Sequence, residues 1–188
     1  MRRTLAAFAF AMLASSAGGA ELDVLALDLG AEREAIERLL AEASLEPLRA
    51  SDREILLDVT IVPGVFERQV TRLRFDDEAR LLSIAVRIEP APHRDGRDVL
   101  QIHQTVRNHL LRRLGRPAWE DAEGSDASSD VLRQLASGEV VRVIEWHGER
   151  RAIRAGIPRR IDGRTNIEIA VTAEPLPRFE RSWGSSGR

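Results

Sequence analysis

Apolar residues that alternate with polar ones are the feature that most limits what this chain can fold into. Alternation with a period of two puts every second side chain on one face of a β-strand, so one face of the resulting sheet is apolar and must be buried. The pattern predicts strands over 55–61, 71–75 and 82–88 in the first half of the chain and over 153–157 and 167–173 in the second. A further strand is expected around 141–146, where either Val141 and Val143 or Ile144 and Trp146 face the core.

Two other segments repeat apolar residues every three to four positions, which is typical of one face of an amphipathic helix. The first covers residues 36–43 and ends before Pro47, because proline is not tolerated in a helix interior. The second covers residues 98–114, with Asp98 as the expected N-cap and Gly115 as the residue that ends it. The apolar positions are Ile36, Leu39, Leu40 and Ala43 in the first helix and Val99, Ile102, Val106, Leu110 and Leu114 in the second.

The order of these segments is one helix followed by three strands, and this order occurs twice. We therefore expect an α+β fold in which two helix-plus-three-strand units, 21–90 and 91–174, form one domain of antiparallel sheet covered by the two helices. The pattern is compatible with one shared sheet or with two. Residues 22–29 are expected to form an edge strand or an extended lead-in, residues 120–130 an acidic surface loop, and residues 131–135 a short helical turn.

The N-terminal residues, 1–20, have the three parts of a secretory signal peptide. Two arginines follow Met1, an uncharged apolar stretch follows them, and small residues precede Glu21. Cleavage after Ala20 or after Ala17 fits the small-residue rule, and the short n-region favours the general (Sec) secretory route. These features predict a periplasmic or secreted protein without a transmembrane segment after cleavage. At the other end, residues 175–188 are expected to be a mobile tail.

The composition removes several classes of function. Apolar residues make up 43% of the 188 positions and charged residues 31%, as in folded soluble domains rather than disordered chains. The sequence has no cysteine and no lysine, which excludes thiol nucleophiles, zinc–thiolate sites, a lipid-anchoring cysteine and Schiff-base chemistry. The net charge of −2 becomes more negative when the two arginines of the signal peptide are removed, which argues against nucleic acid as a partner.

Residues 23–30, with the sequence Asp-Val-Leu-Ala-Leu-Asp-Leu-Gly, lead directly into the first expected helix. This stretch resembles the start of the small envelope domains typified by the BamE/SmpA/OmlA outer-membrane assembly lipoproteins and by the β-lactamase-inhibitor-like fold. Ala26 stands where those domains have a first glycine, and Ala31-Glu32 stands where they have Met-Ser or Met-Thr. The segments 114–117 and 146–148 are similar to the second half of many secreted bacterial domains. The resemblance implies a compact α+β binding domain without catalytic residues.

One loop gathers residues that can bind a metal ion. His93, Asp95 and Asp98 lie in one short stretch and offer imidazole and carboxylate ligands. One of the two aspartates is also needed to cap the helix that follows, which competes with metal binding. His103 and His109 lie on that helix about 120° apart around its axis, so they are not chelating neighbours and we interpret them as polar-face residues.

Arginine replaces lysine throughout the chain, and its side chains are the strongest candidates for binding a partner. Arg72, Arg74 and Arg87 are predicted on the outward faces of neighbouring strands, and Arg154 belongs to a cluster in the second half. Guanidinium groups bind carboxylates and phosphates through two parallel hydrogen bonds, so such a face suits an acidic protein surface or an anionic envelope component. The same arginines can instead pair with outward acidic residues of neighbouring strands, which neutralises the face. The outward acidic residues are Asp58, Glu89 and Glu168.

Two tryptophans have different expected roles. Trp146 is either an exposed aromatic anchor for a partner beside the arginines or a core residue at the end of a strand. Trp119, next to the acidic loop, is the tryptophan that we expect to be exposed.

The sequence as a whole favours a non-catalytic module that binds a protein or an envelope component, without a cofactor. One alternative is a metal-dependent or hydrolytic enzyme that uses His93, Asp95 and Asp98. Another is an inhibitor of a secreted enzyme, in which the 120–130 loop or the arginine-bearing sheet enters a cleft. The sequence pattern does not select an oligomeric state.

Overall fold

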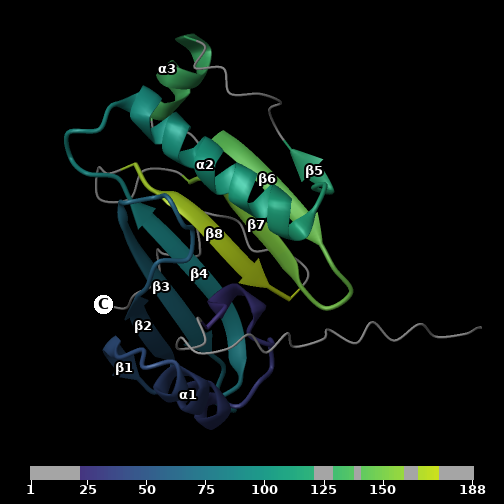
Figure 1. Ribbon diagram of the computed structural model, residues 1–188. Coiled ribbons are helices and arrows are strands. Elements are labelled where there is room, and N and C mark those ends of the chain that lie inside the picture. Colours follow the sequence, from purple (N-terminus) through teal and green to yellow (C-terminus); the bar gives the residue numbers. More distant parts are fainter. Residues whose placement is uncertain (1–21, 121–128, 138–140, 159–164, 174–188) are drawn as a thin grey trace, which may run out of the picture.

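The fold is that of an α+β protein with one eight-stranded antiparallel sheet, shown by a computed structural model (Figure 1). The structure describes residues 22–120, 129–137, 141–158 and 165–173. The expected signal peptide and C-terminal tail lie outside the described residues, as does most of the expected 120–130 loop. Among the described residues, no helix is long and apolar enough to cross a membrane.

The elements of the first half follow one another closely along the chain. They are the 3₁₀ helix η1 (Val24–Ala26), the helix α1 (Arg33–Glu42) and the strands β1 (Pro47–Ser51), β2 (Glu54–Asp58), β3 (Arg68–Phe75) and β4 (Leu81–Glu89). The second half contains the helix α2 (Gly96–Leu114), the strand β5 (Trp119–Glu120), the helix α3 (Ser129–Ser137) and the strands β6 (Val141–His147), β7 (Ala152–Ile157) and β8 (Ile167–Thr172).

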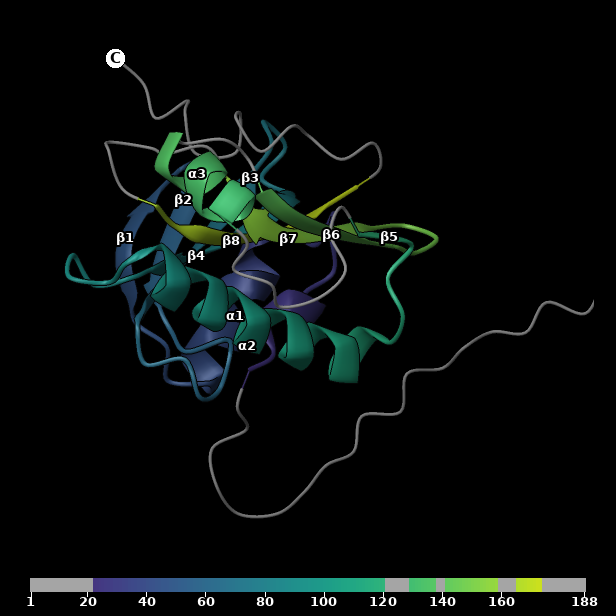
Figure 2. The same ribbon diagram turned by 90° about the horizontal axis from the view of Figure 1, so that it is seen from above.

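The two halves share one sheet, in the order β1-β2-β3-β4-β8-β7-β6-β5. The last strand of each half lies at the centre, where β4 pairs with β8 in antiparallel register. Figure 2 shows α1 and α2 on the same side of the sheet. The helix α3 lies at one end of the sheet beside the first turn of α2, where a Cβ added to Gly96 would be 3.1 Å from Leu132 Cδ2. We call the side of the sheet away from α1 and α2 the open face.

Alternation within the strands explains which side chains form the core. Leu73 on β3 is in register with Ile84 on β4, Ile84 with Val171 on β8, and Val171 with Ile153 on β7. These four residues are buried in the same cluster as Leu40 of α1 and, on α2, Val106 and Leu110. Full burial of each such side chain stabilises the fold by roughly 1.5–3 kcal/mol. The apolar stripes read from the sequence therefore bring the helices to one face of the sheet.

Each half has one strand more than expected. The strand β1 is exposed at all five positions, so it lacks the apolar alternation that marks a half-buried strand. The strand β5 has only two residues, too few to show any period. The expected short turn at 131–135 is the longer helix α3, so the sheet is accompanied by three helices rather than two.

The chain start also differs from the expectation of an edge strand or lead-in over 22–29. Val24 and Leu25 are both buried although they are adjacent, which a strand with one buried face does not allow. A short 3₁₀ helix places both of them in the core.

Helix α2 begins earlier than the sequence pattern indicated, and its N-cap is Asp95 rather than Asp98. The Asp95 carboxylate accepts hydrogen bonds from the backbone N–H groups of Arg97 at 2.7 Å and Asp98 at 3.0 Å. The Asp98 carboxylate in turn accepts a hydrogen bond from the Asp95 backbone N–H at 3.3 Å. This reciprocal arrangement is a capping box, so both aspartates act at the helix start. At the other end Gly115, with φ of 77°, ends the helix as expected.

Strand β6 contains a bulge that explains why two sets of core residues fitted its sequence. Arg142 has φ of 59°, and the register with β7 shifts between Val141 and Ile144. The shift brings Val141, Ile144 and Trp146 together into the core cluster, where strict alternation would have separated Val141 from the other two.

Candidate functional site

The open face collects the four arginines that the sequence singled out. On β3, Arg72 and Arg74 alternate with the core residues Leu73 and Phe75, so their side chains lie on the side away from the helices. Arg87 on β4 and Arg154 on β7 also lie between two core residues, so their side chains face the same side of the sheet as Arg72 and Arg74. The four guanidinium groups therefore belong to one surface, although their strands come from both halves of the chain.

Strand register shows how this surface is arranged. Arg72 on β3 is paired with Ala85 on β4, Ala85 with Ala170 on β8, and Ala170 with Arg154 on β7. One step along the same strands, Ser83 is paired with Thr172. The two central strands thus carry four small side chains on the open face, followed along the same strands by the pair Arg87 and Glu168. We call Ser83, Ala85, Ala170 and Thr172 the small-residue strip.

The inner arginines have acidic partners on the strands further out. Arg72 Nε lies 2.9 Å from Glu54 Oε2, and Glu54 is on β2. Arg154 Nη2 lies 2.5 Å from Glu145 Oε1, and Glu145 is on β6. These ion pairs hold the two arginines in defined positions, with their partners on the far side from the small-residue strip. Acidic residues thus pair with these arginines as the neutralised-face alternative expects, but the partners are Glu54 and Glu145 rather than the expected Asp58, Glu89 or Glu168.

Burial and several neighbouring charges act on Arg72. This residue is only 8% exposed, and burial lowers the pKa of its guanidinium. The charge of Glu54 opposes that shift, while the nearby charges of Arg87 and Arg74 lower the pKa further. The Arg74 side chain makes no ion pair with a described residue. Elsewhere on the same face, Arg87 Nη1 lies 3.8 Å from Glu89 Oε1 and Arg68 Nε lies 3.1 Å from Asp58 Oδ2, so acidic residues accompany the arginines of β3 and β4.

Trp146 does not belong to this surface. It is 7% exposed and lies on the helix side of the sheet, where its indole Nε1 donates a hydrogen bond to the Gly115 carbonyl oxygen. Its register with the core residue Ile153 on β7 sets this orientation, so Trp146 is not an anchor for a partner on the arginine face. Trp119 is 50% exposed, which confirms the expectation for that residue.

The proposed metal loop is arranged for helix capping. Asp95 and Asp98 form the capping box of α2, and His93 is exposed in the turn before it. Hydrogen bonds from the backbone N–H groups of Asp98 and Arg97 lower the pKa of the Asp95 carboxyl group. Over the described ranges, no group of three or more histidine, aspartate or glutamate side chains is placed to hold a metal ion.

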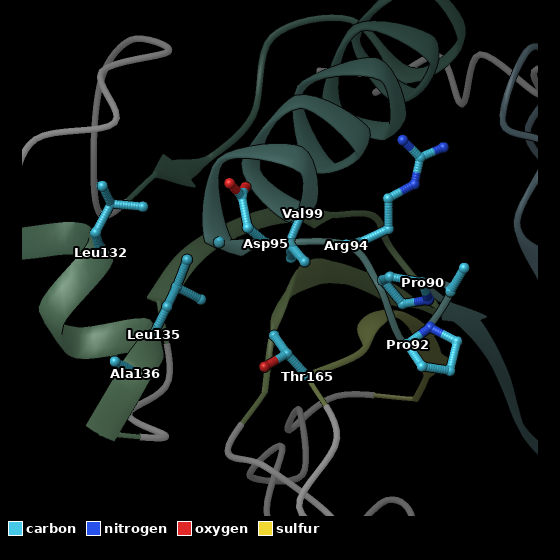
Figure 3. Close-up of a pocket in the computed structure, with 11 residues that line it drawn as sticks. Pro90, Pro92, Arg94, Asp95, Val99, Leu132, Leu135, Ala136 and Thr165 are labelled. Atoms are coloured by element: carbon cyan, nitrogen blue, oxygen red, sulfur yellow. The ribbon is translucent and has the colours of Figure 1, made fainter.

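A cavity of about 530 Å³ lies beside this loop, between the start of α2 and helix α3 (Figure 3). Its walls are mainly apolar, with Pro90 and Pro92 on one side and Leu132 and Leu135 on the other. The Arg94 guanidinium at its edge is paired with Glu67 at 2.9 Å. No local sequence pattern indicates this cavity, because residues from three separate segments line it.

Helix α2 presents one histidine to the interior, contrary to the polar-face interpretation. His103 is 3% exposed, and burial lowers its pKa from 6.5 to about 4. The positive charge of Arg142 lowers the pKa further, while a hydrogen bond with the Arg142 backbone opposes the shift. His109 is partly buried, and its pKa is lowered by burial and by the charges of Arg113 and Arg112.

A rigid loop between β2 and β3 presents an aromatic side chain that the sequence analysis missed. The buried Gln69 amide accepts from the backbone N–H groups of Ile61 and Val62 and donates to the carbonyls of Val62 and Val65. Phe66 follows this turn and is 96% exposed. The Pro63-Gly64 pair, with Gly64 at φ of 82°, was the available signal for a tight turn, but it does not indicate that the next aromatic points outward.

No protein-family model, curated protein or solved structure matches this chain. The resemblance to small envelope domains therefore remains an expectation from residues 23–30.

Proposed function

We propose that this protein is a non-catalytic binding module of the bacterial envelope or medium, and that it holds another protein on the open face of its sheet. The observation that carries the proposal is the row Arg72–Ala85–Ala170–Arg154, which crosses four neighbouring strands. It places two ion-paired arginines on either side of two alanines that are themselves buried. The signal-peptide pattern supports the proposed location.

The chemistry of the row supports recognition. Arginine offers a planar array of donors that matches a carboxylate, and a guanidinium held by an existing ion pair loses less side-chain freedom when it binds. Arg72 and Arg154 are held in this way by Glu54 and Glu145.

The doubled order of helix and strands supports the proposal in a second way. Two units that share a sheet through β4 and β8 give an open face wider than one unit provides. The small-residue strip lies at the junction of the units, so the candidate surface exists only when both are folded together.

The enzyme alternative has no comparable support. Its two aspartates are hydrogen-bonded to the backbone at the start of α2, where they stabilise the helix. The inhibitor alternative is a special case of protein binding, and the same experiment addresses it.

The experiment is affinity capture from envelope extract with the chain that begins at Glu21. One variant replaces Arg72, Arg74 and Arg154 with alanine, and a matched control replaces Arg38, Arg97 and Arg112, which are exposed on α1 and α2. We expect a protein that is retained by the parent chain and by the control but lost with the open-face variant. Equal retention by both variants, or no specific partner at all, would contradict the proposal.

A further inference from the structure

We infer that the cavity between the start of α2 and helix α3 binds an uncharged, mainly apolar small molecule of up to about twenty non-hydrogen atoms. This site is separate from the open face, because no strand of the sheet contributes a described lining residue. It therefore goes beyond the proposed function and does not depend on it.

The size of the cavity fits a small organic molecule. Its volume of about 530 Å³ falls within the roughly 300–1,000 Å³ that is usual for ligand sites. An apolar cavity of about 150 Å³ holds one benzene molecule, and the same filling scales to about twenty non-hydrogen atoms here. That is the size of a few linked aromatic rings or of one alkyl chain of medium length.

The described lining is made mostly of apolar side chains. Figure 3 shows Pro90 and Pro92 on one side of the space and Leu132 and Leu135 on the other, with Val99 of α2 between them. Covering such side chains with a ligand stabilises the complex by roughly 25 cal/mol for each Å² of apolar surface removed from water. The cavity therefore favours ligands whose surface is mainly apolar.

Several contacts hold the walls of the cavity in place. The rings of Pro90 and Pro92 each lock one backbone dihedral angle, and the capping box of Asp95 holds the first turn of α2. On the other side Gly96 permits the close approach of α3, since a Cβ atom added there would lie 3.1 Å from Leu132 Cδ2. A site that is already formed loses less conformational freedom when a ligand binds.

The charges at the rim of the cavity are already compensated, which selects an uncharged ligand. Among the described lining residues only Arg94 and Asp95 carry a charge. The Arg94 guanidinium lies 2.9 Å from the carboxylate of Glu67. The Asp95 carboxylate accepts two backbone hydrogen bonds at the start of α2. Arg97 and Asp98, the next charged residues along the chain, add one charge of each sign. A charged ligand group would thus leave water without an uncompensated opposite charge to meet it, which is costly.

The lining also offers one hydroxyl group to a ligand. Thr165 lies across the space from Val99 in Figure 3. A hydroxyl donates one hydrogen bond and accepts up to two, so Thr165 can bond a ligand in addition to a protein group. An apolar molecule with a single alcohol or amine group fits this arrangement.

The first test uses N-phenylnaphthylamine, an uncharged dye with three aromatic rings and one amine, which becomes fluorescent in apolar surroundings. Anilinonaphthalene sulfonate has the same rings and one added negative charge. We expect saturable binding of the uncharged dye at one site per chain, and binding of the sulfonate that is weaker by about tenfold or more. Decanol should displace the dye, whereas decanoate and decylammonium, with opposite charges on the same chain, should each need about tenfold higher concentrations.

Two variants test whether the dye binds in the cavity. Leu135→Trp puts a larger ring into the space, and Leu132→Asn keeps the size of the side chain but puts a polar amide on the wall. Each should weaken binding of the uncharged dye about tenfold, while Leu39→Trp and Leu39→Asn should alter it less than about twofold. Leu39 is an exposed residue of α1, which lies at the opposite end of the molecule from α3 in Figure 1.

Circular dichroism establishes whether each variant is folded. Leu132 is only partly buried, so Leu132→Asn remains the test if Leu135→Trp does not fold. The comparison of charged and uncharged ligands needs no variant and applies to the parent chain in either case.

Several results would overturn the inference. These are no saturable binding of the uncharged dye, equal binding of the sulfonate, equal displacement by decanol and by either charged chain, and equal losses in the cavity and control variants. A protein captured on the open face should be retained by Leu135→Trp, which changes no residue of that face. Loss of that protein with Leu135→Trp would assign the cavity to protein binding instead of a small molecule.

Discussion

The indole Nε1 of Trp146 donates a hydrogen bond to the backbone carbonyl of Gly115 at 2.9 Å, which ties strand β6 to the end of helix α2. The two residues are 31 positions apart. The bond occupies a carbonyl at the helix end, where the last turn leaves such groups without an intrahelical partner. It thus fixes the position of α2 over the sheet at the end opposite to its capping box.

Removing this bond should lower the stability of the whole fold. Trp146→Phe loses the donor and part of the buried ring, so we expect the free energy of unfolding to fall by about 1–2 kcal/mol. Trp146→Ala adds a cavity and should cost about 3–5 kcal/mol. Urea denaturation followed by circular dichroism measures both. Trp119→Phe, at the exposed tryptophan, should change stability by less than about 0.5 kcal/mol, and a comparable loss there would contradict this assignment.

Buried His103 should make the protein less stable in mild acid. Its pKa is about 4 in the folded state and near 6.5 in the unfolded chain, so the unfolded state binds the proton first as the pH falls. The contribution is fully present above pH 6.5 and is lost between pH 6.5 and about 4, by roughly 3 kcal/mol. His103→Leu should remove most of this dependence in denaturation series across that range. His147→Gln, at an exposed histidine, should retain it.

The Gln69 amide should be essential to the β2–β3 loop. Gln69→Ala removes four hydrogen bonds to backbone groups of residues 61–65, of which the Val62 carbonyl keeps a second one from Val65 N–H, so we expect a loss of roughly 2–3 kcal/mol and faster hydrogen exchange at Val62. Gln69→Glu keeps the shape but loses both donors, and it should also destabilise. Phe66→Ser should leave stability within about 0.5 kcal/mol, because the ring is exposed. A larger loss for Phe66→Ser would mean that the ring supports the fold.

The capping box should be sensitive to acid and indifferent to metal ions. Backbone hydrogen bonds lower the pKa of Asp95, so its contribution is present above the usual carboxyl pKa and is lost as the pH falls through the lowered value. Asp95→Ala should therefore lower the midpoint of thermal unfolding near neutral pH. In acid, the midpoints of the variant and the parent chain should become more similar. Zn²⁺ or Mn²⁺ should raise the midpoint of neither protein. A metal-dependent rise that requires His93 and Asp95 would restore the enzyme alternative.

For most strand residues, the sequence predicts which face of the sheet the side chain occupies. Alternation within β3 is a local property, so the opposite placement of Arg72 and Leu73 follows from the two-residue period alone. The stripes of α1 and α2 likewise identified Leu40 and Leu110 as core residues. Elements without a buried face, above all β1, gave no such signal.

Departures from regular period also escaped the sequence analysis. One extra residue in β6 brings Val141 to the same core side as Ile144 and Trp146, and nothing in the local composition identifies that bulge in advance. His103 was placed on a polar face because histidine is usually exposed or half-buried, whereas its neighbours in the fold enclose it.

By itself the sequence determined six of the eight strands, the two main helices and the side of each regular strand that the arginines occupy, because these depend on residues close together in the chain. The tertiary structure decided that β4 lies beside β8, and with it that Ala85 faces Ala170. Strand pairing across such a separation depends on which apolar faces can be buried together, and a periodic pattern is equally compatible with several orders. The small-residue strip between Arg72 and Arg154 is therefore a product of the fold, assembled from residues that the sequence keeps far apart.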